Sequence, residues 1–248
     1  MVYLVGAGPG DPGLITVRGM ACLEQADVVI YDRLVNQELL ANTKPGAELI
    51  LKQDLGGQGE VNRTLAERAA AGEMVVRLKG GDPFLFGRGG EEAEYLAACG
   101  LSFAVVPGVS SALAVPAYAG IPLTHRHHSA TVGIVTGHEA SPKDGPGVNW
   151  AELSHTVDTL VILMGLGNLP FIVERLLASH MNADTPVAVI SQGTLPVQET
   201  LISTLGEVAE QVQRCGLRSP AVVVVSEVVR FRESISWFEE SAQGPEER

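Results

Sequence analysis

Short, mostly apolar runs alternate with longer stretches of helical periodicity in the first part of the chain. The runs expected to form strands are Val2–Val5, Val28–Tyr31, Leu49–Leu51, Met74–Leu78 and Phe103–Val106. Such nearly continuous apolar segments are typical of strands buried on both faces of a largely parallel sheet. Helical patterns are expected at Thr16–Ala26, Asn62–Ala71 and Gly89–Ala98, the first with Thr16 as its N-cap. This order predicts an α/β domain.

The pattern changes after Pro107-Gly108, where a second α/β series begins. Its expected strands are Thr131–Val135, Thr159–Met164, Val187–Ile190 and Ala221–Val225. Its expected helices are Ser110–Ala119, Leu169–Ser179 and Leu205–Cys215. The simplest interpretation is two α/β domains, residues 1–112 and 113–240, followed by a polar tail at 241–248. Ligands of such folds gather beyond the carboxyl ends of strands, so the glycine turns there are the first candidates for a site.

Composition and charge narrow the class of protein. The chain has 248 residues, 46% of them hydrophobic, which suffices for a proper core and excludes a disordered protein. Its net charge of −12 is opposite to what a non-specific nucleic-acid binder needs. Cys22, Cys99 and Cys215 are far apart, so we expect no disulfide framework, no zinc site and a cytoplasmic location. No apolar run approaches the roughly 20 residues of a membrane span.

The first glycine turn, Gly6–Gly13, follows the first strand and contains G-x-G-x-x-G. Asp32 then follows the second strand, at the offset where dinucleotide-binding folds place a ribose carboxylate. However, a pyrophosphate is held by backbone N–H groups. Pro9 and Pro12 each remove one such donor, and Asp11 adds a negative charge. The turn therefore suits a ligand that approaches the backbone closely without bringing phosphate.

Two further glycine turns follow later strands. The longer one, Lys79–Gly90, has adjacent glycines against which a flat group can pack, and Asp82 could accept hydrogen bonds from a ribose or an amine. The alternative is a strand-to-helix connection without a ligand. In the other turn, Pro107–Ala112, position 112 is Ala where the G-x-S-x-G nucleophile elbow requires Gly, which argues against a serine hydrolase.

Several motifs in order give the chain a family resemblance. They are Val5–Asp11, Tyr31–Val35, Arg77–Phe84, Pro107–Ala112, Gly120–Arg126 and Val135–Glu139. Together they resemble the tetrapyrrole methylase family over nearly the whole chain, and in particular its branch that acts on uroporphyrinogen III. The resemblance implies a homodimer whose subunits each have two α/β domains, with S-adenosylmethionine bound in the cleft between the domains and no metal.

The resemblance also implies roles for individual residues. The expected cofactor contacts are Pro9, Gly80, Gly81, Asp82, Leu85, Ser110, Ser111, Met164 and Gly193. Asp32 matches the family's proposed proton acceptor and Lys52 its proposed donor. The implied reaction methylates carbons 2 and 7 of uroporphyrinogen III, giving precorrin-1 and then precorrin-2 for siroheme and cobalamin synthesis. The loop after Lys52 departs from the family pattern, because it is shorter and lacks a histidine.

A polycarboxylate substrate requires local positive charge in so acidic a protein. The candidates for this role are Arg77, Lys79, Arg88, His125 and Arg126. Arginine is favoured because its planar fork binds carboxylates bidentately.

Other interpretations stay open at this level. Asp32 could be a structural partner of Arg33, and Met164, at the end of a strand, would by itself be assigned to the core. The chain could be another methylase of the same fold, acting on a precorrin, a modified histidine or ribosomal RNA, although its acidic balance argues against RNA. It could also be a nucleotide-binding regulator that uses the first glycine turn. The cluster His125–His128 invites a metal assignment, but its histidines are too close in sequence to converge on one ion.

Overall fold

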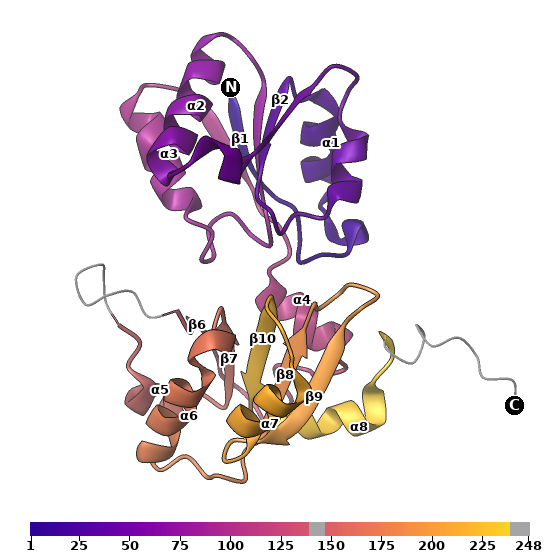
Figure 1. The fold of residues 1–248 in the computed structure, drawn as a ribbon, viewed down its shortest axis with the longest axis vertical. Helices are drawn as coiled ribbons and strands as arrows, with labels where there is room; N and C mark the ends of the chain where they lie inside the picture. Colours follow the sequence, from indigo (N-terminus) through magenta and orange to yellow (C-terminus); the bar gives the residue numbers. More distant parts are fainter. Residues whose placement is uncertain (139–146, 239–248) are drawn as a thin grey trace, which may run out of the picture. The chain divides into compact units, whose positions relative to one another are not determined.

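A computed structural model describes residues 1–138 and 147–238. Glu139 of the last family motif and the tail at 241–248 lie outside the described residues. The chain divides into two compact units, Met1–Ser110 and Ser111–Arg248 (Figure 1). This division falls two residues before the boundary expected from sequence, because Ser111 and Ala112 already belong to the first helix of the second unit.

The first unit is a five-stranded parallel sheet in the order β3-β2-β4-β1-β5. The sequence predicted five strands in a largely parallel sheet but not their order. Its strands are β1 (Val2–Gly6), β2 (Val28–Tyr31), β3 (Glu48–Leu51), β4 (Val75–Lys79) and β5 (Phe103–Val106). Its helices are α1 (Val17–Gln25), α2 (Gln58–Ala70) and α3 (Gly89–Ala98), with 3-10 turns η1 (Pro12–Leu14), η2 (Gln37–Asn42) and η3 (Lys52–Leu55).

Helices cover both faces of this sheet, α1 one face and α2 and α3 the other (Figure 1). Strand residues alternate between the two cores accordingly. In β4, Val76 and Leu78 pack with the α1 side, whereas Val75 packs with α2 and α3. The Thr16 hydroxyl accepts a hydrogen bond from the amide of Gly19, which confirms the predicted N-cap of α1.

The second unit has a mixed sheet in the order β6-β7-β10-β8-β9. Its strands are β6 (Val132–Thr136), β7 (Thr159–Leu163), β8 (Pro186–Ser191), β9 (Glu199–Thr204) and β10 (Ala221–Val225). Its helices are α4 (Ser111–Tyr118), α5 (Trp150–Thr156), α6 (Leu169–Ala178), α7 (Val208–Cys215) and α8 (Arg232–Ile235), with η4 (Leu166–Asn168) and η5 (Glu227–Phe231). Strand β9 and helices α5 and α8 were not predicted from sequence.

Strand direction decides which turns of the second unit lie along one edge. Strands β6 and β7 are parallel, and β10 runs antiparallel to both β7 and β8. The carboxyl ends of β6, β7 and β8 therefore point to the same edge. Helix α4 and η5 pack on one face of the sheet, and α5, α6 and α7 pack on the other. Among the described residues, no helix combines the length and the apolar composition needed to cross a bilayer.

Candidate active site

Three glycines pack against one another at the carboxyl edge of the first sheet. A Cβ on Gly6 would lie 2.5 Å from the Cα of Gly108 and 2.6 Å from the carbonyl oxygen of Gly81. These glycines end or follow β1, β5 and β4, which are adjacent in the sheet. Only residues without a side chain permit this approach, so the glycines of all three turns share one packing requirement.

The amides of the first glycine turn are largely used within the protein. The amide of Ala7 donates to the carbonyl of Lys79 (2.8 Å), and Gly8 and Gly81 exchange two backbone hydrogen bonds of 3.3 and 2.7 Å. The amide of Gly13 donates to Asp11 Oδ1 at 2.7 Å. Pro9 and Pro12, whose nitrogens have no hydrogen, lie in the same turn. Together these features leave few donors for a pyrophosphate.

Helix α1 also differs from the phosphate-binding helix of a dinucleotide fold. Such a helix opens directly from the glycine turn and presents its first amides to the ligand. Here η1 intervenes, α1 begins only at Val17, and Thr16 caps the amide of Gly19. The geometry therefore agrees with the sequence argument against a dinucleotide site.

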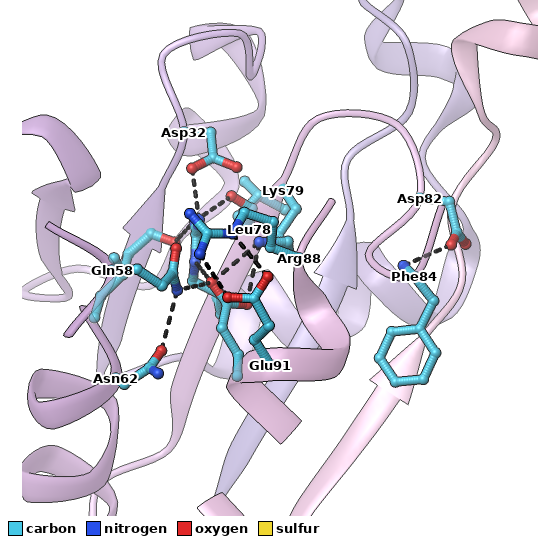
Figure 2. Close-up of polar contacts among 12 residues, drawn as sticks. Asp32, Gln58, Asn62, Leu78, Lys79, Asp82, Phe84, Arg88 and Glu91 are labelled. Carbon is cyan, nitrogen blue, oxygen red and sulfur yellow. Dashed lines mark hydrogen bonds and ion pairs between the residues drawn. The ribbon is translucent and has the colours of Figure 1, made fainter. Parts of the chain in front are cut away.

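Asp82 holds the second and third glycine turns together. Its Oδ1 accepts from the amides of Phe84 (2.8 Å) and Leu85 (3.1 Å), and its Oδ2 accepts from the amide of Gly108 (3.1 Å). Figure 2 shows the contact with Phe84. A carboxylate has about four lone-pair positions, so three amides leave one for a ligand. Asp82 thus fixes the backbone of this edge and retains capacity for a further donor.

The two expected acid–base residues follow neighbouring strands. Tyr31 of β2 pairs with Leu51 of β3, and Asp32 and Lys52 are the next residues along each strand. Both side chains are half-buried. The parallel sheet therefore brings together, at the edge that carries the glycines, a carboxylate and an amine that lie twenty positions apart in sequence.

Arg77 and Lys79, which were expected to bind substrate, are buried and paired. The side chain of Arg77 is 0% exposed and that of Lys79 is 2% exposed. Arg77 Nε donates to Glu92 Oε1 at 3.0 Å, and Lys79 Nζ lies 3.1 Å from each Glu92 carboxylate oxygen. Gln58 Nε2 donates to the same Glu92 at 3.1 Å. Because they face α2 and α3, these two cations present no charge to solvent.

Asp32 joins this buried cluster from the edge of the sheet. Its Oδ1 lies 2.5 Å from Arg77 Nη2, and its side chain is 25% exposed. The structural pairing that the sequence left open for Asp32 is therefore present, but its partner is Arg77 rather than Arg33. Burial, and then the charge of Arg77, lower the pKa of Lys79.

The remaining candidate cations are more accessible. Arg88 directly precedes α3, and its guanidinium donates to the Glu91 carboxylate at 2.9 and 2.5 Å (Figure 2). Both side chains are exposed. This hydrogen bond raises the pKa of Arg88 and lowers that of Glu91. In the second unit Arg126 is exposed, whereas His125 is half-buried and stacks on Phe231 with ring centroids 4.4 Å apart.

Two turns at the carboxyl edge of the second sheet have unusual backbone conformations. Met164 follows β7 with a φ of +55°, and it is 55% exposed rather than part of the core. Gln192 and Thr194, which flank Gly193 after β8, have φ values of +51° and +68°. A Cβ on Gly193 would lie 2.4 Å from Val115 of α4. Residues other than glycine rarely adopt positive φ values, and backbone strain of this kind is concentrated at binding sites.

The described residues contain no group of three or more His, Cys, Asp and Glu side chains arranged to hold a metal ion. His125, His127 and His128 form an aromatic group instead, with centroid separations of 5.9 and 4.9 Å from His125.

Comparison with known proteins decides the family. The model of the tetrapyrrole (corrin/porphyrin) methylases matches residues 1–209. The chain belongs to the tetrapyrrole methylase family. It is 48% identical to a uroporphyrinogen-III C-methyltransferase of Synechocystis, over 93% of this chain and 89% of that protein. It is 49% identical to a siroheme synthase of Azotobacter vinelandii, of which it spans only 52%.

A crystal structure of Thermus thermophilus uroporphyrin-III C-methyltransferase complexed with S-adenosylhomocysteine has the same fold. Its TM-score is 0.79 at 40% identity, with 92% of this chain and 98% of that chain covered. The family assignment agrees with the geometry of the first glycine turn. S-adenosylmethionine carries no phosphate, so its binding does not require a row of free backbone amides.

Glu92 and Gln58 are the residues of this site that sequence reasoning did not identify. Glu92 lies in the first turn of α3, where an acidic side chain is ordinarily explained by its favourable interaction with the helix dipole. The available signal was the pair Arg77 and Lys79, which lie two residues apart and therefore on the same face of a buried strand. Two buried cations on one face require a buried acid.

Proposed function

We propose that this chain is an S-adenosylmethionine-dependent C-methyltransferase that converts uroporphyrinogen III into precorrin-2 through precorrin-1. Relatives of that name, similar over almost their whole length, support the substrate, and the first glycine turn supports the cofactor. The observation that carries the proposal is the internal use of the amides of Ala7, Gly8 and Gly13 beside two prolines. The product feeds siroheme and cobalamin synthesis.

The cofactor residues proposed from the family pattern lie on turns that follow strands. Pro9, Gly80 and Gly81 belong to the glycine turns of the first unit, where Asp82 and Leu85 complete the second turn. Ser110 directly precedes α4 and Ser111 is its first residue, while Met164 and Gly193 follow β7 and β8. Bound there, S-adenosylmethionine supplies an electrophilic methyl group. The protein's part is to align the acceptor carbon and to exclude water.

Asp32 is the proposed proton acceptor and Lys52 the proposed donor. Methylation of a pyrrole carbon leaves a proton to be removed later, and the Asp32 carboxylate is partly exposed at the same edge as the glycine turns. A well-placed base contributes about 10²–10⁴-fold to a rate. Arg77 fixes one oxygen of this carboxylate, which favours a single orientation of the other.

The substrate carboxylates are assigned to Arg88 and Arg126, with His125 as a further candidate. Arg77 and Lys79 are left out of direct substrate contact, since their charges are buried and already paired. A homodimer and a cytoplasmic location belong to the same proposal. The free thiols of Cys22, Cys99 and Cys215 agree with a reducing compartment.

The deciding experiment is incubation of the purified chain with enzymatically generated uroporphyrinogen III and labelled S-adenosylmethionine. We expect two labelled methyl groups per macrocycle and a red-fluorescent oxidised product. Absence of label from the macrocycle, with donor in excess, would refute the proposal. Calorimetry with NAD and with S-adenosylhomocysteine tests the cofactor separately, and only the second is expected to bind.

A matched pair of variants tests the role of Asp32. Asp32 follows β2, and Asp27 precedes the same strand, where it pairs with Lys44 at 2.5 Å. We expect Asp32→Asn to lower kcat by about 10²-fold or more while S-adenosylhomocysteine affinity is retained. Asp27→Asn makes the same chemical change at the other edge of the sheet and is expected to keep kcat. Equal kcat values for the two variants would remove Asp32 from the reaction.

A further inference from the structure

A buried group of four charges connects helix α3 to the exposed carboxylate of Asp32. Arg77 and Lys79 of β4 supply two positive charges, and Glu92 and Asp32 supply two negative ones. Three of these side chains are at most 2% exposed, and only Asp32 reaches the edge of the sheet. The formal charges balance only if Asp32 is included. The carboxylate proposed as the base is therefore also a partner of the buried charges.

The guanidinium of Arg77 makes the connection by its geometry. Its Nε donates to Glu92 (3.0 Å), its Nη1 to the carbonyls of Ile30 (3.2 Å) and Leu78 (3.1 Å), and its Nη2 to Asp32 (2.5 Å). A planar fork held by three buried acceptors cannot rotate without breaking several hydrogen bonds. The fourth donor consequently points in a fixed direction, toward Asp32.

Glu92 contributes the one charged acceptor among those three. It also draws Lys79 to itself, since Lys79 Nζ lies 3.1 Å from both Glu92 oxygens. Lys79 is thus paired with Glu92 of α3, and Arg77 is the cation that pairs with Asp32. Gln58 of α2 donates to Glu92 at 3.1 Å and fixes its orientation in turn.

We infer that Glu92 is a positioning residue for Asp32, acting through Arg77 to set where the proposed proton acceptor lies. This inference rests on the proposed function, because it concerns the residue assigned there as the base. Neutralising the buried charge is the simpler role for Glu92. The two roles differ in what they predict when Asp32 itself is absent.

The test is a double-mutant cycle on kcat. Replacing Lys79 and Glu92 together by methionine removes one charge of each sign, and such replacement of a buried pair is often neutral for stability. We expect Lys79→Met/Glu92→Met to lower kcat at least tenfold, with S-adenosylhomocysteine affinity within twofold of wild type. In the Asp32→Asn background the same pair of changes is expected to lower kcat less than twofold, because no base remains to be positioned. Equal losses in both backgrounds, or no loss in either, would overturn the inference.

A matched control and a structural readout complete the test. Lys44→Met/Asp27→Asn also removes one charge of each sign, at the opposite edge of the sheet, and is expected to keep kcat. In a crystal structure of the Lys79→Met/Glu92→Met variant we expect the Asp32 carboxylate to be displaced. An unmoved carboxylate refutes positioning even if the methylation assay itself fails, so this result is independent of the proposed function.

If the double methionine variant does not fold, Arg77→Lys replaces it. Lysine keeps the charge but is a point donor that cannot span Glu92 and Asp32 at once. We expect the same non-additivity with Asp32→Asn, and additive losses would again overturn the inference.

Discussion

The packing of Gly108 allows a sharp test of the close contact among Gly6, Gly81 and Gly108. In Gly108→Ala the new Cβ would lie 2.3 Å from the carbonyl oxygen of Gly81 and 2.7 Å from the Cα of Gly6. Ordinary contact begins near 3.4 Å, so the turns must separate by about 1 Å, and both neighbours are backbone. Overpacking of this kind costs about 1–3 kcal/mol of unfolding free energy. Displacement of a site by about 1 Å can cost 10²-fold in activity.

Two measurements follow these consequences separately. We expect thermal unfolding of Gly108→Ala to begin several degrees below wild type, and calorimetry to show S-adenosylhomocysteine affinity reduced at least tenfold. Gly59→Ala is the matched control, because Gly59 lies in α2 with nothing within 4 Å of its added Cβ. That substitution should leave affinity unchanged and slightly raise stability. If Gly108→Ala unfolded at the same temperature as wild type, the steric argument would be refuted. If the variant were destabilised but bound S-adenosylhomocysteine with unchanged affinity, the cofactor would have to bind elsewhere.

Two further predictions concern other parts of the molecule. Arg88→Ala and Arg126→Ala are each expected to raise the KM for uroporphyrinogen III while S-adenosylhomocysteine affinity, measured by calorimetry, stays within twofold; an unchanged KM removes that residue from the substrate site. Hydrogen bonds from Ala130 and Thr131 lower the pKa of Asp158, so its stabilising effect is present above the unfolded value of 3.8 and is lost as pH falls through the lower folded pKa. Asp158→Asn should therefore lose less unfolding free energy than wild type on acidification below about pH 4. Equal losses of unfolding free energy for the two proteins over this pH range would contradict the prediction.

The strands of the first sheet and the three helices beside them were predictable because they are specified locally, although α2 begins at Gln58, four residues before the predicted start. Its strands are short apolar runs between helical segments, and α1 carries its own N-cap at Thr16. Strand β9, Glu199–Thr204, was missed because it is the outermost strand of its sheet. Its residues are exposed or half-buried and form no continuous apolar run. Helix α8 has only four residues, too few for a helical period to show.

Some features of the candidate site could likewise be predicted from local sequence, whereas others depend on contacts between residues far apart in the chain. The shortage of amides in the first glycine turn could be argued from Pro9 and Pro12 alone. The use of the Gly8 amide by Gly81 depends on the pairing of turns seventy residues apart, which sequence spacing does not give. Met164 shows the opposite case, because an apolar residue at a strand end is expected in the core. Met164 is instead 55% exposed and has a positive φ, and neither property is visible in the sequence.

Glu91 and Glu92 show why residue type alone could not assign the charges. They are adjacent in the first turn of α3, yet Glu91 pairs with exposed Arg88 and Glu92 is buried against Arg77 and Lys79. A step of one residue turns a helix by about 100°, so neighbours face different surroundings. The alternation of side chains along β4 could have identified the buried cations, because residues 75, 77 and 79 share the face that packs on α2 and α3. Two of the cations expected to bind a polycarboxylate substrate are therefore buried and paired inside the protein, and the proposed binding of that substrate is assigned to the exposed Arg88 and Arg126 instead.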